Sequence, residues 1–182
     1  ILSGKYGKTR LVTAKIISSV LFGILAFTLH VIVAFGLPLA AFGADGWNLP
    51  LQVAGLTIPY PFTFLQAALI NLGVIYLVLL AMIGLTLLLS AKMKSPYLVL
   101  VVLVPVLFIP LFLSPNGTTG AYNLTLFLLP YRSVMPEIGK YVSYQIGGFV
   151  LDALSMRAIL YAILTAVMLP LARLGFQKHQ VA

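Results

Sequence analysis

The sequence predicts an all-α fold: a polytopic membrane helix bundle of four transmembrane helices, with short re-entrant or interfacial helices on the outer side. Three observations favour this class. Hydrophobic residues make up 62% of the 182 residues and charged residues 8%, and the mean hydropathy is +1.12. The apolar residues form long runs, each flanked by lysine or arginine on one side. Because too little polar surface remains to cover a water-soluble fold, the bilayer is the expected solvent.

A single transmembrane domain is predicted over residues 1–182. A basic cytoplasmic segment, 1–15, precedes the first span, and a tail, 175–182, follows the last. The predicted spans are residues 16–42, 62–91, 96–113 and 156–174. The first run alone exceeds the roughly 20 residues that cross about 30 Å of hydrocarbon.

Local signals set several of these boundaries. Ser95 and Pro96 are typical of an N-cap and a first helical position, and they predict the start of the third span. Pro105 and Pro110 predict a kink in that span, because each removes a backbone donor. Gly175 stands where a C-cap would end the last span.

The basic residues predict the orientation. One side of the four-span arrangement collects Lys5, Lys8, Arg10, Lys15, Lys92, Lys94, Arg173 and Lys178, whereas the other has Arg132, Lys140 and Arg157. Eight against three predicts a multi-pass protein of the cell membrane, plasma or inner, with both termini of this segment in the cytoplasm. The acids Asp45, Glu137 and Asp152 then fall on the outer side. Since the basic residues form no stripe with interleaved aromatics, nucleic acid is not an expected partner.

The outer segment, residues 114–155, contains two short apolar stretches around a polar elbow. Neither stretch is long enough to cross, so they predict re-entrant or interfacial helices; an ordinary loop with aromatic anchors is the alternative. In the last span Ala158, Ala162 and Ala166 recur every four residues, a stripe that favours close helix packing. The alternative is that small residues are simply common in membrane helices.

Catalytic constellations are not recognisable in the sequence. It has no cysteine, His30 and His179 fall at different membrane levels, and no carboxylate lies within a predicted span. This argues against a metalloprotease, an aspartyl protease and a carrier that moves protons on intramembrane acids. We expect no enzyme activity, metal site or cofactor in this chain. His30, Gln66 and Asn71 are expected to form hydrogen bonds with neighbouring helices.

Three segments carry a family resemblance. ILSGKYGKTRLVTAK leads directly into a span, LTLFLLPYRSVMPEIGKYVSYQIGGFVLDALS precedes the last span, and ARLGFQKHQVA ends the chain. This order resembles the C-terminal two-thirds of a permease subunit of a type-2 ABC exporter. In that family a cytoplasmic coupling helix precedes the third helix, and one or two re-entrant helices precede the sixth. The first two family helices have no counterpart, so the resemblance implies a fragment that lacks part of its translocation unit.

The resemblance implies a function for two groups of residues. Coupling to an ATPase would fall to Lys5, Tyr6, Lys8, Arg10 and Lys15, with Gly4 and Gly7 allowing a tight turn. The positive-inside rule alone is the alternative explanation of these charges. An outer gate would be formed by Pro130, Tyr131, Arg132, Glu137 and Lys140.

The partners implied are an ABC ATPase subunit that binds ATP and Mg²⁺, a second permease subunit, identical or different, and the lipid bilayer. Two other functions stay open. The chain could be a membrane scaffold or assembly subunit without transport activity, or a fragment of a carrier driven by an ion gradient.

Overall fold

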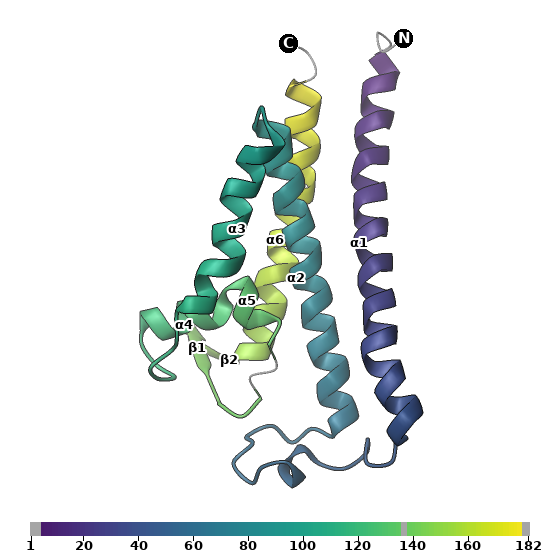
Figure 1. Cartoon of the computed structure of the whole chain (residues 1–182). Helices are drawn as coiled ribbons and strands as arrows, with labels where there is room; N and C mark the ends of the chain where they lie inside the picture. The colour runs from purple at the N-terminus through teal and green to yellow at the C-terminus, as the bar shows by residue number, and fades with distance from the viewer. Residues whose placement is uncertain (1–4, 136–137, 180–182) are drawn as a thin grey trace.

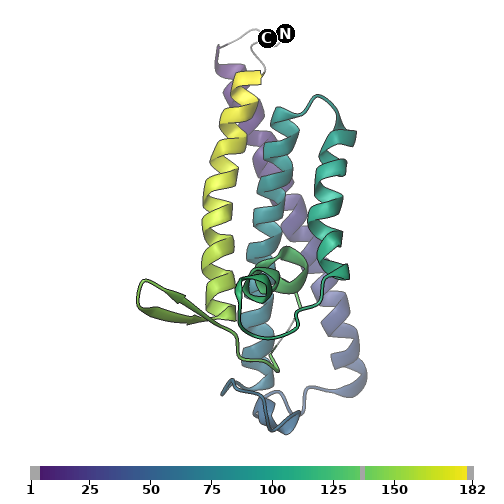
Figure 2. The same ribbon diagram turned by 90° about the vertical axis from the view of Figure 1, so that its left-hand side faces the viewer.

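The computed structural model describes residues 5–135 and 138–179, and the side chains of 9–135 and 138–177. The elements are α1 (Lys5–Phe42), η1 (Leu51–Val53), α2 (Phe64–Lys92), α3 (Pro96–Phe112), α4 (Ala121–Leu128), α5 (Pro130–Ser133), β1 (Ser143–Ile146), β2 (Phe149–Asp152) and α6 (Ala153–His179). In Figures 1 and 2 the helices α1, α2, α3 and α6 run side by side, and α4, α5 and the two strands gather at one end.

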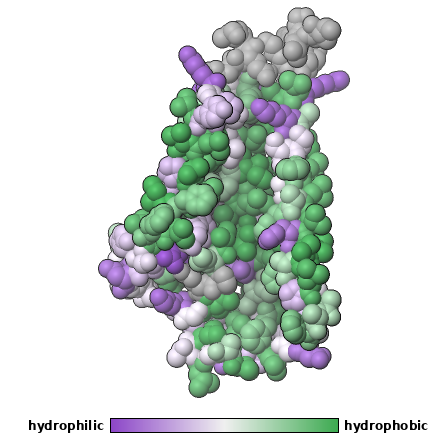
Figure 3. Space-filling model, in the orientation of Figure 1, coloured by the Kyte–Doolittle hydropathy of each residue, from purple (hydrophilic) through white to green (hydrophobic). Residues whose placement is uncertain are grey.

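Three helices in the described part of the chain are long and apolar enough to cross a membrane, within Thr9–Phe42, Phe64–Lys92 and Ala153–Gln177. The helix α3 is apolar but has 17 residues, shorter than these three. In Figure 3 apolar side chains cover most of the length of the helices, and most hydrophilic side chains lie towards the two ends. Helix length and composition therefore indicate a membrane-embedded protein.

The backbone amides at the start of α2 all have acceptors. Thr63 Oγ1 accepts from the Gln66 amide at 3.3 Å, and Gln66 Oε1 accepts from the Thr63 amide at 3.0 Å. The amides of Phe64 and Leu65 donate to the carbonyls of Leu49 and Trp47. The preceding loop is thereby tied to the start of α2. Gln66 caps its own helix, so the expected bond to a neighbouring helix is wrong.

The core lies mainly between α2 and α6. Its middle is formed by the buried Val74, Val78, Ala81 and Tyr161. Glycine allows close approach at two further points: a Cβ on Gly84 would lie 3.1 Å from the Met168 Cβ, and one on Gly175 would lie 3.0 Å from the Ala91 Cβ. At such distances a side chain would push the two helices apart, so both glycines fix the interhelical spacing.

The helix α1 packs more loosely on the bundle. In its most apolar stretch no residue is buried. Mid-helix, the Thr28 hydroxyl lies 2.6 Å from the Tyr76 hydroxyl of α2, and Phe27 meets Tyr76 edge to face. His30, which was expected to form a hydrogen bond with a neighbouring helix, is exposed on α1, and Thr28 makes such a contact instead. At its N-terminal end Val12 is 1% exposed in a cluster with Leu87, Ala91, Ala172 and Phe176.

Several sequence predictions are confirmed and others are corrected. Ser95 and Pro96 begin α3 as expected, with Ser95 Oγ accepting from the Tyr97 amide. The last helix extends beyond the predicted span 156–174 at both ends: it begins at Ala153 and continues through Gly175 to His179. Gly175 is no C-cap, because the helix continues past it. Its lack of a Cβ allows the close contact with Ala91.

The second apolar stretch of the outer segment is a β-hairpin, not a helix. The strands β1 and β2 pair antiparallel, with Ser143 opposite Asp152 and Ile146 opposite Phe149. Gly147 and Gly148 have φ of +55° and +90°. Two consecutive positive φ values are the geometry of the tight hairpin turn that glycine favours. The prediction of an all-α fold is therefore wrong at this hairpin.

The alanine stripe of α6 does not form the contact with α2. Ala158 packs partly against the Val74–Tyr161 cluster, whereas Ala162 and Ala166 are exposed. Larger residues one position away, Tyr161 and Thr165, face α2 instead. Close packing of the alanines on another helix stays a prediction for a second chain.

Candidate functional site

The end of the molecule that holds the first turns of α1 also holds the α2–α3 turn and the last turns of α6 (Figure 1). Exposed basic residues gather there: Arg10, Lys92, Lys94 and Arg173. The Lys15 ammonium lies 4.1 Å from the centroid of the Phe176 ring, so a cation–π contact joins α1 to α6. With the Val12 cluster, this contact links α1, α2 and α6 at their basic end.

The predicted coupling residues belong to α1 itself. Lys5, Tyr6 and Lys8 lie in its first turns, and their side chains are outside the described residues. Gly4 is likewise outside them, and Gly7 is helical. No turn at Gly7 therefore separates a coupling helix from the first span within residues 5–42.

At the other end a buried arginine joins α4 to α6. Arg157 is 2% exposed, and its Nε donates to the Phe127 carbonyl of α4 at 2.8 Å. The Tyr161 hydroxyl, one turn further along α6, donates to the Leu128 carbonyl at 2.7 Å. The Tyr144 hydroxyl of β1 donates to the Leu124 carbonyl at 2.9 Å. We call these three donors the α4 clamp.

The α4 clamp has a clear physical basis. Phe127 and Leu128 lie in the last turn of α4, where the carbonyls of a helix lack intrahelical partners and carry partial negative charge, which favours a nearby cation. Each hydrogen bond to a charged group is worth about 1.5–3 kcal/mol. Arg157 thus satisfies a buried carbonyl and fixes α4 to α6 through an interaction that spans 30 residues of chain.

Three of the predicted gate residues, Pro130, Tyr131 and Arg132, lie in α5, which follows α4 in the chain. Pro130 opens α5, and Arg132 Nη2 donates to the Leu113 carbonyl at the end of α3 at 3.0 Å. The Arg132 guanidinium also lies 5.9 Å from the Tyr131 ring centroid. Lys140 is exposed, and Glu137 lies outside the described residues. Arg132 therefore caps α3 in the same way that Arg157 caps α4.

A second polar contact lies between the loop before α2 and the hairpin. Burial raises the pKa of Tyr60 to about 12, and the neighbouring Asp152 carboxylate adds to the rise. Asp152 Oδ2 also accepts from the Leu154 amide at 3.1 Å, at the start of α6. One carboxylate thus serves both the helix start and the buried phenol.

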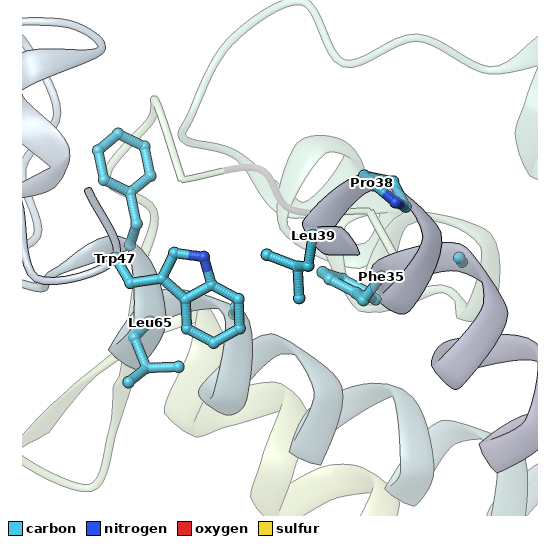
Figure 4. Close-up of a pocket in the computed structure, with 8 residues that line it drawn as sticks. Phe35, Pro38, Leu39, Trp47 and Leu65 are labelled. Carbon is cyan, nitrogen blue, oxygen red and sulfur yellow. The ribbon is translucent and has the colours of Figure 1, made fainter. Parts of the chain in front are cut away.

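An apolar cavity of about 410 Å³ lies between α1, the following loop and α2. Figure 4 shows the Trp47 indole between Leu65 on one side and Leu39 and Phe35 on the other. All eight lining residues are apolar: Ala34, Phe35, Pro38, Leu39, Trp47, Phe64, Leu65 and Ala68. Such a wall offers no group for acid–base or metal chemistry, and its complement is hydrocarbon.

Comparison with known proteins gives no relative: no family model, curated protein or solved structure matches the chain. Within the described residues, no three His, Asp or Glu side chains are grouped as metal ligands would be. The arrangement offers mechanical connections: two arginines hold the ends of α3 and α4, and α6 connects α4 to the basic end.

Sequence reasoning missed the most buried charge in the described part of the chain. In the sequence Arg157 counts as one of three outer basic residues, not as a site residue. The signal was available, because an ionisable residue at the edge of an apolar run is by default a functional candidate. Its partner was not foreseeable, since a backbone carbonyl 30 residues away leaves no trace in local sequence.

Proposed function

We propose that this chain is the transmembrane permease subunit of an ATP-driven exporter, coupled to a separate ATPase subunit that binds ATP and Mg²⁺. A second permease subunit would complete the pathway in the plasma or inner membrane. The chain itself would carry no catalytic site. Export by this subunit would need a cytoplasmic surface that receives force, an outer gate, and a rigid connection between them.

The observation that carries the proposal is the double attachment of α6. Near one end Phe176 contacts Lys15 of α1, and near the other Arg157 holds α4. At about 1.5 Å per residue, these positions are about 29 Å apart along the helix. A force on the first turns of α1 would reach α4 and α5 through this one element.

The four-span arrangement forms part of the proposal. At about 1.5 Å per residue, α3 extends about 26 Å, close to the hydrocarbon thickness of about 30 Å. It runs beside α2 from the turn with Lys92 and Lys94 towards α5 (Figure 1). A crossing by α3 would return the chain to the outer side and bring α6 back to the cytoplasm.

The decisive experiment is vanadate-sensitive export in vesicles. We expect the full chain, purified with its partners from its own membranes, to bring an ATPase with it and to support ATP-dependent flux of a fluorescent amphiphile. The double variant Lys8→Glu/Arg10→Glu should lose both association and flux. Lys140→Glu, which changes one exposed charge at the opposite end, is the matched control.

Other results identify the other functions. Flux that depends on an ion gradient and survives vanadate would assign an ion-driven carrier. Stable association with partners but no flux of any substrate would assign a scaffold or assembly subunit. Unchanged association and flux in Lys8→Glu/Arg10→Glu would remove the coupling role of the α1 terminus.

A further inference from the structure

A groove of about 680 Å³ opens at the outer end, between the loop before α2, the helices α2 and α6, and the chain around the hairpin. Its volume lies within the range of small-molecule sites, about 300–1,000 Å³. The groove has two unlike parts. One is a polar corner with Tyr60, Tyr141 and Asp152, and the other is an apolar wall with Ile70, Leu77 and Ala158.

Aromatic rings and a carboxylate meet in the polar corner. Tyr60 stacks on Phe62 with centroids 5.7 Å apart, and the Tyr141 ring is tilted against Tyr60 at 6.2 Å. The Asp152 carboxylate lies beside the Tyr60 hydroxyl. Ring faces carry negative electrostatic potential, and a carboxylate next to them adds a full negative charge. This combination attracts an organic cation.

Two basic residues lie near the corner without lining the groove, Arg157 and Lys140. None of the described residues that line the groove is lysine or arginine. Arg157 lies close enough to act on Tyr60 electrostatically, but its Nε is directed to the Phe127 carbonyl. Lys140 is next to Tyr141 in the chain and is exposed. The described residues that line the groove therefore supply a carboxylate and aromatic rings but no cationic side chain.

We propose that this groove binds an amphiphile with a cationic ammonium head. The head would lie against the exposed Tyr141 ring and the Asp152 carboxylate, beside the buried Tyr60, and the hydrocarbon tail would follow Ile70, Leu77 and Ala158 along α2 and α6. With the polar corner at the membrane surface, the apolar wall would lie deeper along α2 and α6. The head and the tail of such a molecule would then each meet a matching part of the groove. Binding goes beyond the proposed export and does not depend on it.

The test uses two probes with the same tail and opposite heads: dodecyltrimethylammonium and dodecyl sulfate. The full chain in an uncharged detergent is photolabelled with an alkyltrimethylammonium that carries a diazirine in its tail. We expect labels concentrated on residues 59–77 and 152–158. Excess dodecyltrimethylammonium should remove them, whereas dodecyl sulfate should not.

Variants separate head recognition from simple partition into detergent. Asp152→Asn keeps a side-chain oxygen for the start of α6 and should weaken binding about tenfold, which corresponds to about 1.4 kcal/mol. Tyr141→Ala removes a half-exposed ring that supports no helix start, and it should weaken binding without loss of the fold by circular dichroism. Asp45→Asn, at an exposed acid in the loop between α1 and α2, is the matched control.

The proposal fails if both heads compete equally, if Asp152→Asn binds like the unaltered chain, or if labels spread over all exposed helix faces. Repetition in nanodiscs identifies the source of the ligand. Loss of labelling in choline or ethanolamine lipids, but not in phosphatidylglycerol, would show that a membrane lipid fills the groove. Labelling in all three would show that the site prefers free cationic amphiphiles.

Discussion

Arg157 is a charged residue in a buried environment, whereas an arginine side chain is normally exposed to water. An arginine that is 2% exposed has lost nearly all its hydration, and its hydrogen bond to Phe127 compensates part of that loss. The Phe127 carbonyl depends on this bond in turn, because a buried carbonyl that loses its donor is left without compensation. Residues of this kind hold a structure in one arrangement more than they raise its total stability.

Replacing Arg157 should therefore release α4 specifically. We expect Arg157→Met to cost about 1–3 kcal/mol, because the Phe127 carbonyl stays buried without its donor. Amide hydrogen exchange over residues 121–135 should rise, while α2 stays protected. Arg173→Met, on an exposed face of the same helix, is the control. Unchanged protection of 121–128 would show that the α4 clamp is not what holds this segment.

Tyr60 gives a prediction for alkaline pH. Burial and the Asp152 carboxylate raise its pKa from 10.0 to about 12 in the folded protein. A raised pKa means that the protonated phenol stabilises the fold fully below about pH 10, and that this stability is lost as the pH rises through about 12. In a phenolate absorbance titration, Tyr60→Phe should remove a component near pH 12. Tyr97→Phe, at an exposed ring, should leave that component in place.

At the scale of elements, the spacing of α2 and α6 is the controlling feature. Gly84 lies against Met168, whereas a Cβ added to Gly73 on the same helix would meet no atom within 4 Å. Gly84→Val should overpack the interface and cost about 1–3 kcal/mol more than Gly73→Val, since both variants share the same change in helix propensity. Thermal unfolding in detergent measures the difference. Equal midpoints would mean that the helices separate without strain.

Sequence reasoning worked where a signal is local. Ser95 and Pro96 were enough to locate the start of α3, because capping involves neighbouring residues. It failed where one residue type serves two purposes. A glycine at position 175 could end the last helix or allow another helix to approach closely. The sequence does not distinguish these roles, whereas the position of Ala91 in the structure shows the close approach.

Residues 114–155 also show where prediction from the sequence failed. Their apolar content predicted helices, and the pair Gly147–Gly148 was the competing hairpin signal. The candidate site was less predictable still. Tyr60 and Asp152, or Arg157 and Phe127, are brought together by helix packing, and nothing in either stretch of sequence specifies its partner.

For the whole molecule, the proposed orientation can be tested through its lack of cysteine. Single cysteines at Lys94 and Lys140 are matched exposed positions at opposite ends. In intact cells, Lys140→Cys should react with a membrane-impermeant maleimide, and Lys94→Cys should react only after permeabilisation. The reverse pattern would invert the proposed topology and contradict the proposal that the basic end faces an ATPase. Reaction of both cysteines in intact cells would contradict a membrane crossing between them.

The α4 clamp also has a consequence for biogenesis. Its donors come from residues 20, 30 and 33 positions after the carbonyls that they serve. A chain made from its N-terminus would expose the end of α4 before any of these donors has emerged, and hydrocarbon would not tolerate those carbonyls. Until α6 inserts, residues 114–155 would therefore have to stay in contact with water or with a chaperone. The insertion of α6 would then allow this earlier segment to fold.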